Sequence, residues 1–341
     1  MPTTACNALP VGAAVGWLYS RCIGHRAACD ATLSGDLRMH AVPLPAPPPL
    51  RAAHCLAAPL PAAPGPQLFT LDTLGLPASF LDDVASHADS LCWDPYDVQV
   101  RRRRVLQRYR CILAAPQRDL LDACDGDAGH PAWPVLLDGL PGILADALRR
   151  VAPHRRRAMR TYLADRRVDG SWWLQPLPDT VFEQPGNADR IARRQFAPLS
   201  PVLSNHPGLL RLLTCVAETV HARRAATRLR LVVHQMLTVA GLAGGTEPAP
   251  EGIHQDGADF IVSALVVRRR GIHGGVSRVR RGPTGPVHLE RALAEGEGIF
   301  QPDTRSPWWH EVSTIHADAA AFEGYRMILG VDAHLLPDAT A

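Results

Sequence analysis

Lysine is absent from this 341-residue chain, although lysine and arginine together number 36. Arginine therefore carries all of the basic charge, and 33 acidic residues reduce the formal net charge to +3. A charge this close to balance gives no broad cationic field of the kind that attracts nucleic acid. We interpret the arginine runs at 101–104, 155–157 and 268–270 as solvated surface and expect no nucleic-acid partner.

Long apolar runs are also missing. No stretch reaches the roughly 20 apolar residues that a membrane-spanning helix needs, and no positive charge at the N-terminus precedes a continuous apolar segment. We therefore expect no membrane association, no secretory signal and a cytoplasmic location. The sequence indicates no particular oligomeric state.

The eight cysteines include no Cys-x-x-Cys pair and no spacing typical of a zinc site. This excludes the common zinc-binding and dithiol redox motifs. In a reducing compartment, cysteines in the folded part are expected to be free thiols that behave as small core residues.

Proline is concentrated in two segments, residues 43–50 and 59–66. Proline at this density interrupts helices and strands and favours an extended or disordered chain. We therefore predict a disordered Pro/Ala-rich extension over residues 1–66 and one folded domain over residues 67–337. A docking segment is the alternative for the extension, and the activity of a chain that begins near Leu68 would distinguish the two.

Hydrophobic periodicity predicts helices first and strands later. Short strands between Gly/Pro turns are typical of an antiparallel sandwich or barrel, so the predicted class is α+β with a mainly β core. The predicted helices cover residues 77–93, 133–163 (interrupted at Pro141) and 209–224, and the predicted strands cover 108–113, 228–240, 259–267, 298–300, 310–315 and 325–331.

A metal-binding pattern precedes the strand predicted at 259–267. His254 and Asp256 are two residues apart, and in an extended chain residues i and i+2 project from the same side. A second histidine would complete two imidazoles and one carboxylate, the ligand set of non-haem Fe(II) oxygenases. His310 is the best candidate and His316 is its main rival. A polar pair at a loop–strand junction and a core histidine are the alternative interpretations.

Four blocks in this region share their order and approximate spacing with one family. Residues Pro250–Gly257, Leu265–Ser277, Asp303–Ile315 and Gly324–Leu329 resemble the bacterial 2-oxoglutarate/Fe(II)-dependent dioxygenases that hydroxylate free amino acids, the family that contains isoleucine 4-hydroxylase. Weaker matches lie upstream, at Phe182–Asn187, Arg194–Leu199 and Val233–Gln235.

The resemblance implies a double-stranded β-helix, the jelly-roll or cupin-like fold, with flanking helices. It implies Fe(II) held by His254, Asp256 and His310, with 2-oxoglutarate and O2 as cosubstrates, a small-molecule substrate, release of succinate and CO2, and ascorbate as an in vitro reductant. Arg326 would bind the distal carboxylate of 2-oxoglutarate, because a guanidinium forms two parallel hydrogen bonds with a carboxylate. The candidate substrate residues in the matching blocks are Gln184, Asn187, Arg194, Gln235 and Ser277, and Gly274 and Gly275 are expected to form a tight turn.

Two other functions are compatible with these residues. One is a non-catalytic cupin-like protein in which the histidines hold a structural Zn2+ or a ligand, a role that needs no carboxylate clamp such as Arg326. The other keeps the oxygenase chemistry but acts on a peptide or a natural-product intermediate.

Overall fold

In the computed structural model, the described residues are 50–61, 64–124, 130–137, 140–178, 181–183, 193–241, 244–319, 321 and 323–338. Two compact units divide the chain, Met1–Ala46 and Pro47–Ala341, and every described residue belongs to the second. No helix in this described part is both long enough and apolar enough to cross a membrane.

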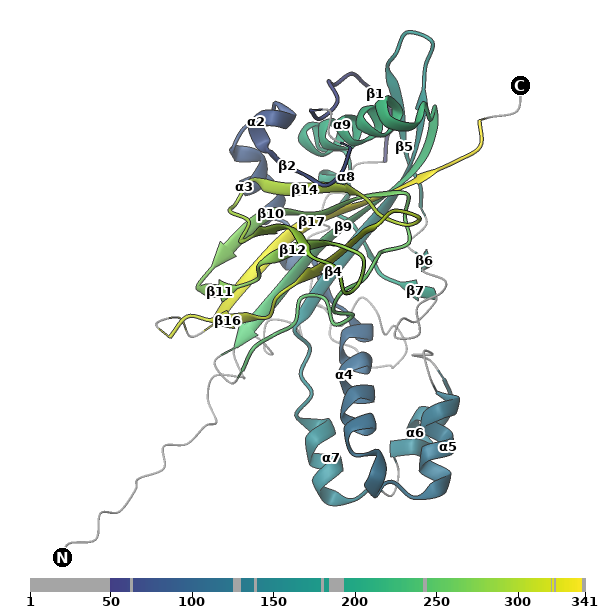
Figure 1. Cartoon of the computed structure of the whole chain (residues 1–341), viewed down its shortest axis with the longest axis vertical. Coiled ribbons are helices and arrows are strands. Elements are labelled where there is room, and N and C mark those ends of the chain that lie inside the picture. The colour runs from purple at the N-terminus through teal and green to yellow at the C-terminus, as the bar shows by residue number, and fades with distance from the viewer. Residues whose placement is uncertain are drawn as a thin grey trace, which may run out of the picture. The chain divides into compact units, whose positions relative to one another are not determined.

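A ten-stranded, mostly antiparallel sheet forms the centre of the second unit (Figure 1). Its four longest strands lie side by side in the order β4 (Arg155–Arg166), β9 (Arg228–Gly241), β17 (Glu323–Leu335) and β10 (Phe260–Arg270). The remaining strands are β1 (Ala53–Cys55), β2 (Gln67–Thr70), β3 (Cys92–Trp93), β5 (Trp172–Pro176), β8 (Ala197–Pro198) and β14 (Glu297–Pro302).

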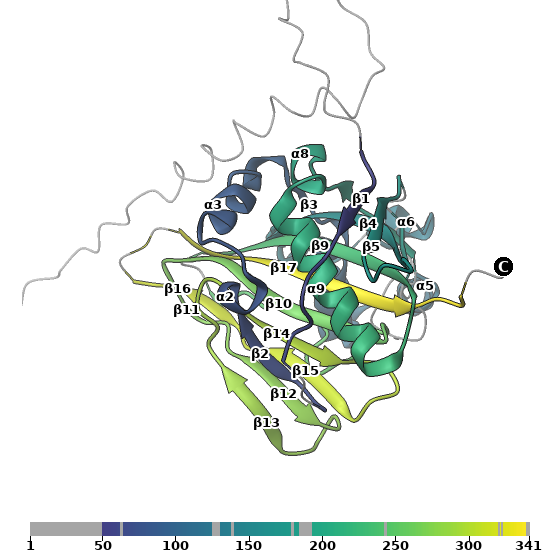
Figure 2. The same ribbon diagram turned by 90° about the horizontal axis from the view of Figure 1, so that it is seen from above.

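One face of this sheet is covered by α9 (Pro207–Arg224), and Figure 2 shows this helix lying across the strands. His206 caps α9, because its side chain accepts a hydrogen bond from the Gly208 amide in the first turn at 3.1 Å. Leu231 and Val233 of β9 pack into the core under α9, whereas the intervening side chains project from the other face. Shorter helices complete the cover: α2 (Leu71–Leu74), α3 (Ser79–Ala85), η2 (Ala88–Ser90) and α8 (Pro201–Ser204).

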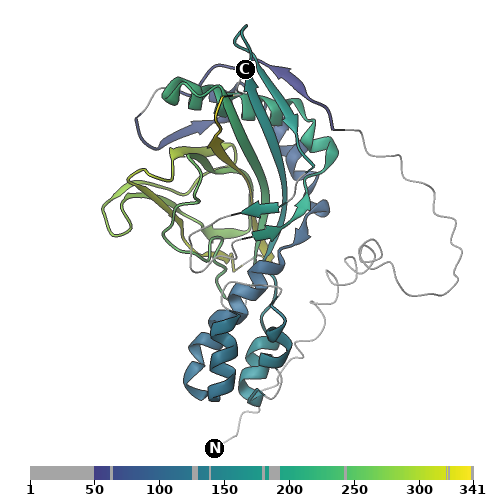
Figure 3. The same cartoon turned by 90° about the vertical axis from the view of Figure 1, so that its right-hand side faces the viewer.

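The opposite face of the main sheet carries the functional region. A smaller sheet of β12 (Ser277–Arg281), β13 (Val287–Arg291) and β15 (Trp308–Val312) packs toward this face through a cluster that includes Val279, Ile299 and Ile328. Figure 3 shows these yellow-green strands opposite the long teal and green strands of the main sheet. The two layers form a jelly roll, as predicted. Two ribbons lie beside them: β6 (Val181–Glu183) with β7 (Arg193–Gln195), and β11 (Ile272–Gly274) with β16 (Ile315–Ala317).

A helical insertion, residues 95–149, separates β3 from β4. It contains α4 (Pro95–Arg108), η3 (Arg110–Ile112), α5 (Ala115–Ala123), α6 (Ala132–Leu137) and α7 (Gly142–Arg149), at the lower end of Figure 1. Its helices bury a small core of their own, which includes Leu106, Leu136 and Leu144. Asp94 caps α4 by accepting hydrogen bonds from the amides of Tyr96 and Asp97.

Most of the predicted elements are present with small shifts in their ends, but three predictions are wrong in part or in full. The helix predicted over 77–93 ends at Ala85, and Cys92–Trp93 form β3. Residues 108–113 end α4 and form η3, so they are not a strand. The helix predicted over 133–163 ends at Arg149, and β4 begins at Arg155. Sheet pairing overrides local propensity here, because β4 pairs with β9 over residues 155–165 and with β5 over residues 162–166. In addition, the strand predicted at 310–315 is divided between β15 and β16.

The strand pairing of the sheet begins before residue 67. β1 pairs with β5, and Leu60 is buried in the core below α9. The predicted extension over 1–66 falls largely outside the described residues, so its boundary with the domain stays a prediction.

Candidate metal centre

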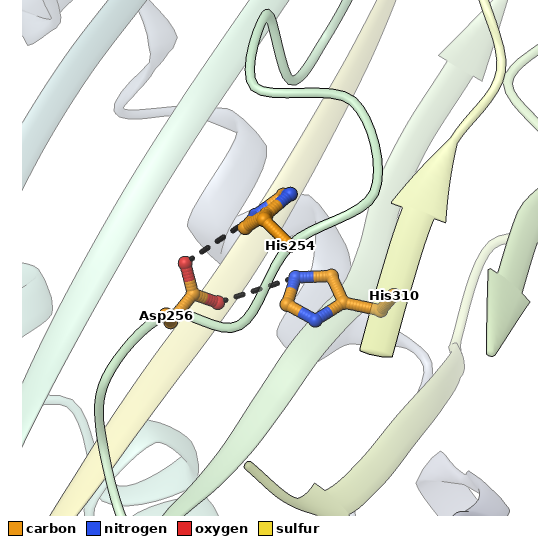
Figure 4. A group of neighbouring side chains, drawn as sticks. All are labelled: His254, Asp256 and His310. Atoms are coloured by element: carbon orange, nitrogen blue, oxygen red, sulfur yellow. Dashed lines mark ion pairs between the residues drawn. The ribbon is translucent and has the colours of Figure 1, made fainter. Parts of the chain in front are cut away.

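Two histidines and one aspartate converge on the face of the main sheet opposite α9 (Figure 4). His254 lies in the loop before β10, and His310 lies on β15. The two residues form an isolated antiparallel bridge with two backbone hydrogen bonds of 2.9 Å. Asp256 extends its carboxylate between the rings, with Oδ1 3.5 Å from His254 Nε2 and Oδ2 3.3 Å from His310 Nε2. One potential ligand atom from each residue lies within 4.8 Å of the others.

The orientation of the His254 ring is set by a backbone carbonyl. His254 Nδ1 lies 2.7 Å from the Gly252 oxygen, which can only accept, so Nδ1 donates and Nε2 of the neutral ring keeps its lone pair. Gly252 has a φ of 70°, a conformation that favours glycine. Fixing a ligating histidine through its second nitrogen is the usual arrangement around a protein-bound metal.

The charge distribution favours a cation at this point. Burial raises the pKa of the Asp256 carboxyl, but the neighbouring charges and hydrogen bonds of His310 and His254 outweigh burial and hold this pKa well below its usual range. The carboxylate is therefore ionised and lies between two bases. A divalent metal ion that accepts imidazole and carboxylate ligands fits this donor set.

Residues behind the ligands hold them in place. The Gln255 amide nitrogen donates to the backbone oxygens of Asp303, Ser306 and Trp308, at 2.7, 3.0 and 2.8 Å. It thereby joins the ligand loop to the connection between β14 and β15. Asp303 Oδ2 accepts from the Gly257 amide at 2.7 Å, and its Oδ1 is 4.0 Å from His310 Nδ1. Burial, followed by the Asp256 charge, raises the pKa of Asp303 to about 8.

Asp303 was missed as a supporting residue by our sequence reasoning. It is the first residue of one of the blocks that carry the family resemblance, and this position could have marked it as a candidate. Its side chain reaches the metal centre through contacts that a one-dimensional pattern does not show.

A pocket adjoins the three ligands. Its walls include every second residue of β17 from Arg326 to Asp332, every second residue of β9 from His234 to Thr238, and Ser277 of β12. Arg326 is 4% exposed, and within the described part of the chain its Nε and Nη2 have no hydrogen-bond partner. Burial and then the positive charge of Arg269 lower the pKa of Arg326 to about 10. A buried guanidinium in this state fits a carboxylate ligand.

The other predicted residues lie in different places. Arg194 and Ser277 line the pocket and are buried. Gln235 lies on the helix-covered face of β9, because strand residues alternate in direction, and its amide donates to the Val84 oxygen at 3.0 Å. Gln184 and Asn187 lie outside the described residues.

His316 is separate from the metal centre, since it lies on the β11–β16 ribbon and stacks on His273 with ring centroids 5.3 Å apart. Gly274 and Gly275 have φ values of 78° and 63°, as a tight turn requires. Trp308 packs on His288 at the outer sheet and does not line the pocket.

Arginines 155 and 157 correct one interpretation. The run 155–157 was read as solvated surface, but Arg155 and Arg157 are each 7% exposed and line the pocket. The strand alternation of β4 turns both of them inward, whereas Arg156 points away and its guanidinium lies 4.4 Å from the Trp93 ring centroid.

Two histidines and one carboxylate that converge on a jelly roll are a candidate metal centre, and this set of residues is the ligand class of non-haem Fe(II) oxygenases. The sequence matches the 2OG-Fe dioxygenase family over residues 144–332, more than half of the chain, and the chain belongs to this family. It is a 2-oxoglutarate-dependent dioxygenase, and the family implies Fe(II) and 2-oxoglutarate as its metal and cosubstrate.

The chain is similar to solved structures at low sequence identity. A bsmA homologue from Methylobium petroleophilum PM1 is 18% identical, with a TM-score of 0.56 over 81% of this chain and 92% of its own. IDO from Bacillus thuringiensis is 15% identical, with a TM-score of 0.45 over 54% of this chain and 75% of its own. The Fe(II)/α-ketoglutarate-dependent dioxygenase TqaL is 16% identical, with a TM-score of 0.39 over 59% and 78%. A search of the curated proteins finds no match.

Proposed function

We propose that this dioxygenase hydroxylates an unactivated C–H bond of a small substrate, in the first instance a free L-amino acid. The observation that supports the proposal most is the occurrence, in one pocket, of the three ligands and the buried guanidinium of Arg326. A structural metal site would need the ligands but would gain nothing from a desolvated cation beside them.

His254, Asp256 and His310 would hold Fe(II) on one side and leave the pocket side open to ligands. When bound, the iron with 2-oxoglutarate and O2 supplies the oxidising power, and 2-oxoglutarate leaves as succinate and CO2. The protein residues orient the reactants and exclude water. Gln255 and Asp303 keep the ligand loop and the His310 strand in register, since both bind atoms on the opposite segment.

Arg326 would receive the distal carboxylate of 2-oxoglutarate. Its two unpartnered nitrogens, Nε and Nη2, are the pair that a guanidinium uses for a bidentate contact. Ser277, buried on the facing sheet, can add a hydroxyl donor to the same part of the pocket. The two contacts would fix the end of 2-oxoglutarate that does not reach the metal.

The first experiment measures succinate formed by purified protein with Fe(II), ascorbate, O2 and 2-oxoglutarate, across the twenty L-amino acids and a control without substrate. Stimulation by one or a few amino acids supports the proposal. Uniform background succinate keeps the chemistry but directs the search to a peptide or a natural-product intermediate. No succinate from folded, iron-loaded protein contradicts it.

Two histidine variants test the ligand assignment. We expect His310→Ala to lose substrate-dependent succinate formation, because one of three metal ligands is removed. His316→Ala is the matched control, since this histidine lies on the neighbouring β16 and stacks on His273. It is expected to keep wild-type activity. Loss of activity in His316→Ala together with retention in His310→Ala would contradict the assignment.

A further inference from the structure

A second cationic region lines the pocket, on β4 and on the β6–β7 ribbon. Arg155, Arg157 and Arg194 are all buried there. Arg155 is neutralised, because its Nη2 lies 2.9 Å from Asp94 Oδ2 and its Nη1 donates to the Pro248 oxygen at 3.2 Å. Arg157 has no comparable acidic partner at salt-bridge distance among the described residues.

A chain of hydrogen bonds through the neutral imidazole of His234 holds Arg157. Its Nη2 lies 2.9 Å from His234 Nδ1, and arginine can only donate, so Nδ1 accepts. His234 Nε2 then carries the proton and donates to Asp332 Oδ2 at 3.2 Å. The guanidinium also stacks on aromatic rings, 4.3 Å from the Phe196 centroid and 5.3 Å from that of Phe182. These contacts orient the group, but the carboxylate at the end of the chain, Asp332, is bonded to His234 and not to the guanidinium.

The environment of Arg157 is unfavourable for its charge when the pocket holds no anion. Burial, followed by the positive charges of Arg194 and Arg155, lowers its pKa to about 9. Its Nε is buried, with no hydrogen-bond partner in the described chain. Buried donors without partners are rare in native structures and call for a ligand or another explanation.

This cationic region is separate from Arg326. In the register of the sheet, Arg326 is level with Thr238 and Arg155, whereas Arg157 is level with Met236 and Ile328. β4 and β17 are separated by β9, so their backbones lie roughly 10 Å apart. The two guanidiniums also have different charged neighbours, Arg269 for Arg326, and Arg194 and Arg155 for Arg157. The pocket therefore has two places for a carboxylate besides the metal.

We propose that Arg157, assisted by Arg194, binds the free carboxylate of the organic substrate, with His234 and Asp332 as positioning residues. The inference rests on the proposed function and narrows it. A chain-internal residue of a peptide has no such carboxylate, so the substrate would be a free acid. The apolar side chains of Met236, Val262 and Ile328, which also line the pocket, suit an aliphatic substrate.

The kinetic test compares Arg157→Gln and Arg157→Lys with Arg160→Gln. Arg160 is the matched control because it is buried on the same strand but donates to the Leu177 and Leu199 oxygens instead of lining the pocket. With the amino acid that stimulates the wild type, we expect Arg157→Gln to raise the KM for that amino acid roughly tenfold to a hundredfold. Arg157→Lys should recover part of the loss, since it keeps the charge without the fork.

The Arg157 variants must leave the KM for 2-oxoglutarate unchanged while the KM for the amino acid rises. A merely structural role would change both of these quantities together. An unchanged amino-acid KM in Arg157→Gln, or an equal rise in the KM for 2-oxoglutarate, would overturn the carboxylate assignment while the proposed function stands.

A binding test does not depend on turnover. Propionate and propionamide differ in charge but hardly in shape, and each is titrated calorimetrically into oxygen-free protein saturated with Fe(II) and 2-oxoglutarate. We expect the wild type and Arg160→Gln to bind propionate but not propionamide, and Arg157→Gln to bind neither. Equal binding of the two compounds, propionate binding that survives in Arg157→Gln, or no propionate binding by the wild type would each overturn the proposal. If the amino-acid panel yields no succinate, the proposed function fails. This titration still tests whether Arg157 binds a carboxylate.

Discussion

At the scale of single residues, Arg326 is the residue that we propose binds the distal carboxylate of 2-oxoglutarate. It is buried on β17, with two donor nitrogens that lack partners among the described residues. We expect Arg326→Gln to raise the KM for 2-oxoglutarate roughly tenfold to a hundredfold, because a charge-assisted bidentate contact is lost. Arg326→Lys should show a smaller rise, since lysine keeps the positive charge but cannot supply the two parallel hydrogen bonds.

Initial rates measured over a range of 2-oxoglutarate concentrations check this expectation. The Fe(II) concentration that gives half-maximal activity serves as the internal control, and it should not change because Arg326 is not one of the three metal ligands. An unchanged KM for 2-oxoglutarate would contradict the role given to Arg326. A loss of Fe(II) binding with no change in the KM for 2-oxoglutarate would indicate that Arg326 supports metal binding instead.

The residues of the site differ in how readily the sequence reveals them. His254 and Asp256 are two positions apart, and such a spacing has a direct geometric meaning. The preference for His310 over His316 and the role expected of Arg326 both depended on blocks that resemble a family. Arg157 was hidden in an arginine run, because the direction of each side chain depends on whether the segment is a helix or a strand. Arg155 and Arg157 are buried because β4 pairs within the sheet, and the composition of the segment does not reveal this pairing.

At the scale of elements, the candidate metal centre lies where two segments meet. The loop with His254 and Asp256 meets β15 through one backbone bridge, and the Gln255 amide binds three oxygens on the connection before β15. We expect Gln255→Leu to weaken Fe(II) binding roughly tenfold to a hundredfold, the usual effect of removing support behind a ligand. Excess Fe(II) should restore most of the activity.

The measurement is activity as a function of Fe(II) concentration at saturating 2-oxoglutarate. Gln175→Leu is the matched control. It replaces the same type of side chain, but Gln175 is exposed on β5, away from the site. Equal Fe(II) dependence in both variants would show that the three hydrogen bonds of Gln255 do not support the ligands.

Element prediction succeeded where local pattern and tertiary role agree. α9 was found nearly to the residue, since its leucines and valines recur at helical spacing and pack on the sheet. β9 and β17 were found because both are apolar runs bounded by turns. β4 was misread because its arginines, whose long stems suit a helix, have no strand signal of their own. Its neighbours in the sheet decide its conformation.

At the scale of the whole molecule, the helical insertion contacts the segment that leads to the metal ligands. Arg104 of α4 forms an ion pair with Glu247 at 2.6 Å and donates to the Pro250 oxygen. Asp97 Oδ2 accepts from the His154 amide at 3.0 Å, at the start of β4. The insertion thus borders both the ligand loop and the strand with Arg155 and Arg157. Its place was not predictable, because the long-range pairs that attach it are far apart in sequence.

The N-terminal boundary of the folded unit can be tested by two deletions. We expect a variant that lacks residues 1–49 to keep the Tm and the activity of the full chain, since the pocket is lined by residues between Arg155 and Asp332. A variant that lacks residues 1–66 should melt at a lower temperature. It loses the pairing of β1 with β5, the buried Leu60 side chain and the 2.8 Å hydrogen bond from the Leu60 amide to Thr219 Oγ1.

Point variants separate the role of the core from that of chain length. Leu60→Ala should destabilise the full chain by about 2–5 kcal/mol, the range for a buried leucine, whereas Leu56→Ala, at a side chain that is 70% exposed, should leave the Tm unchanged. Thermal melts of the two deletion variants, the two point variants and the full chain measure these changes in Tm. If the variant that lacks residues 1–66 melts with the full chain, the folded unit begins at residue 67, as the proline-rich sequence predicted. If it melts early while the variant that lacks residues 1–49 does not, the segment from residue 50 to 66 belongs to the domain, because its strand and its leucine complete a sheet and a core built from residues far along the chain.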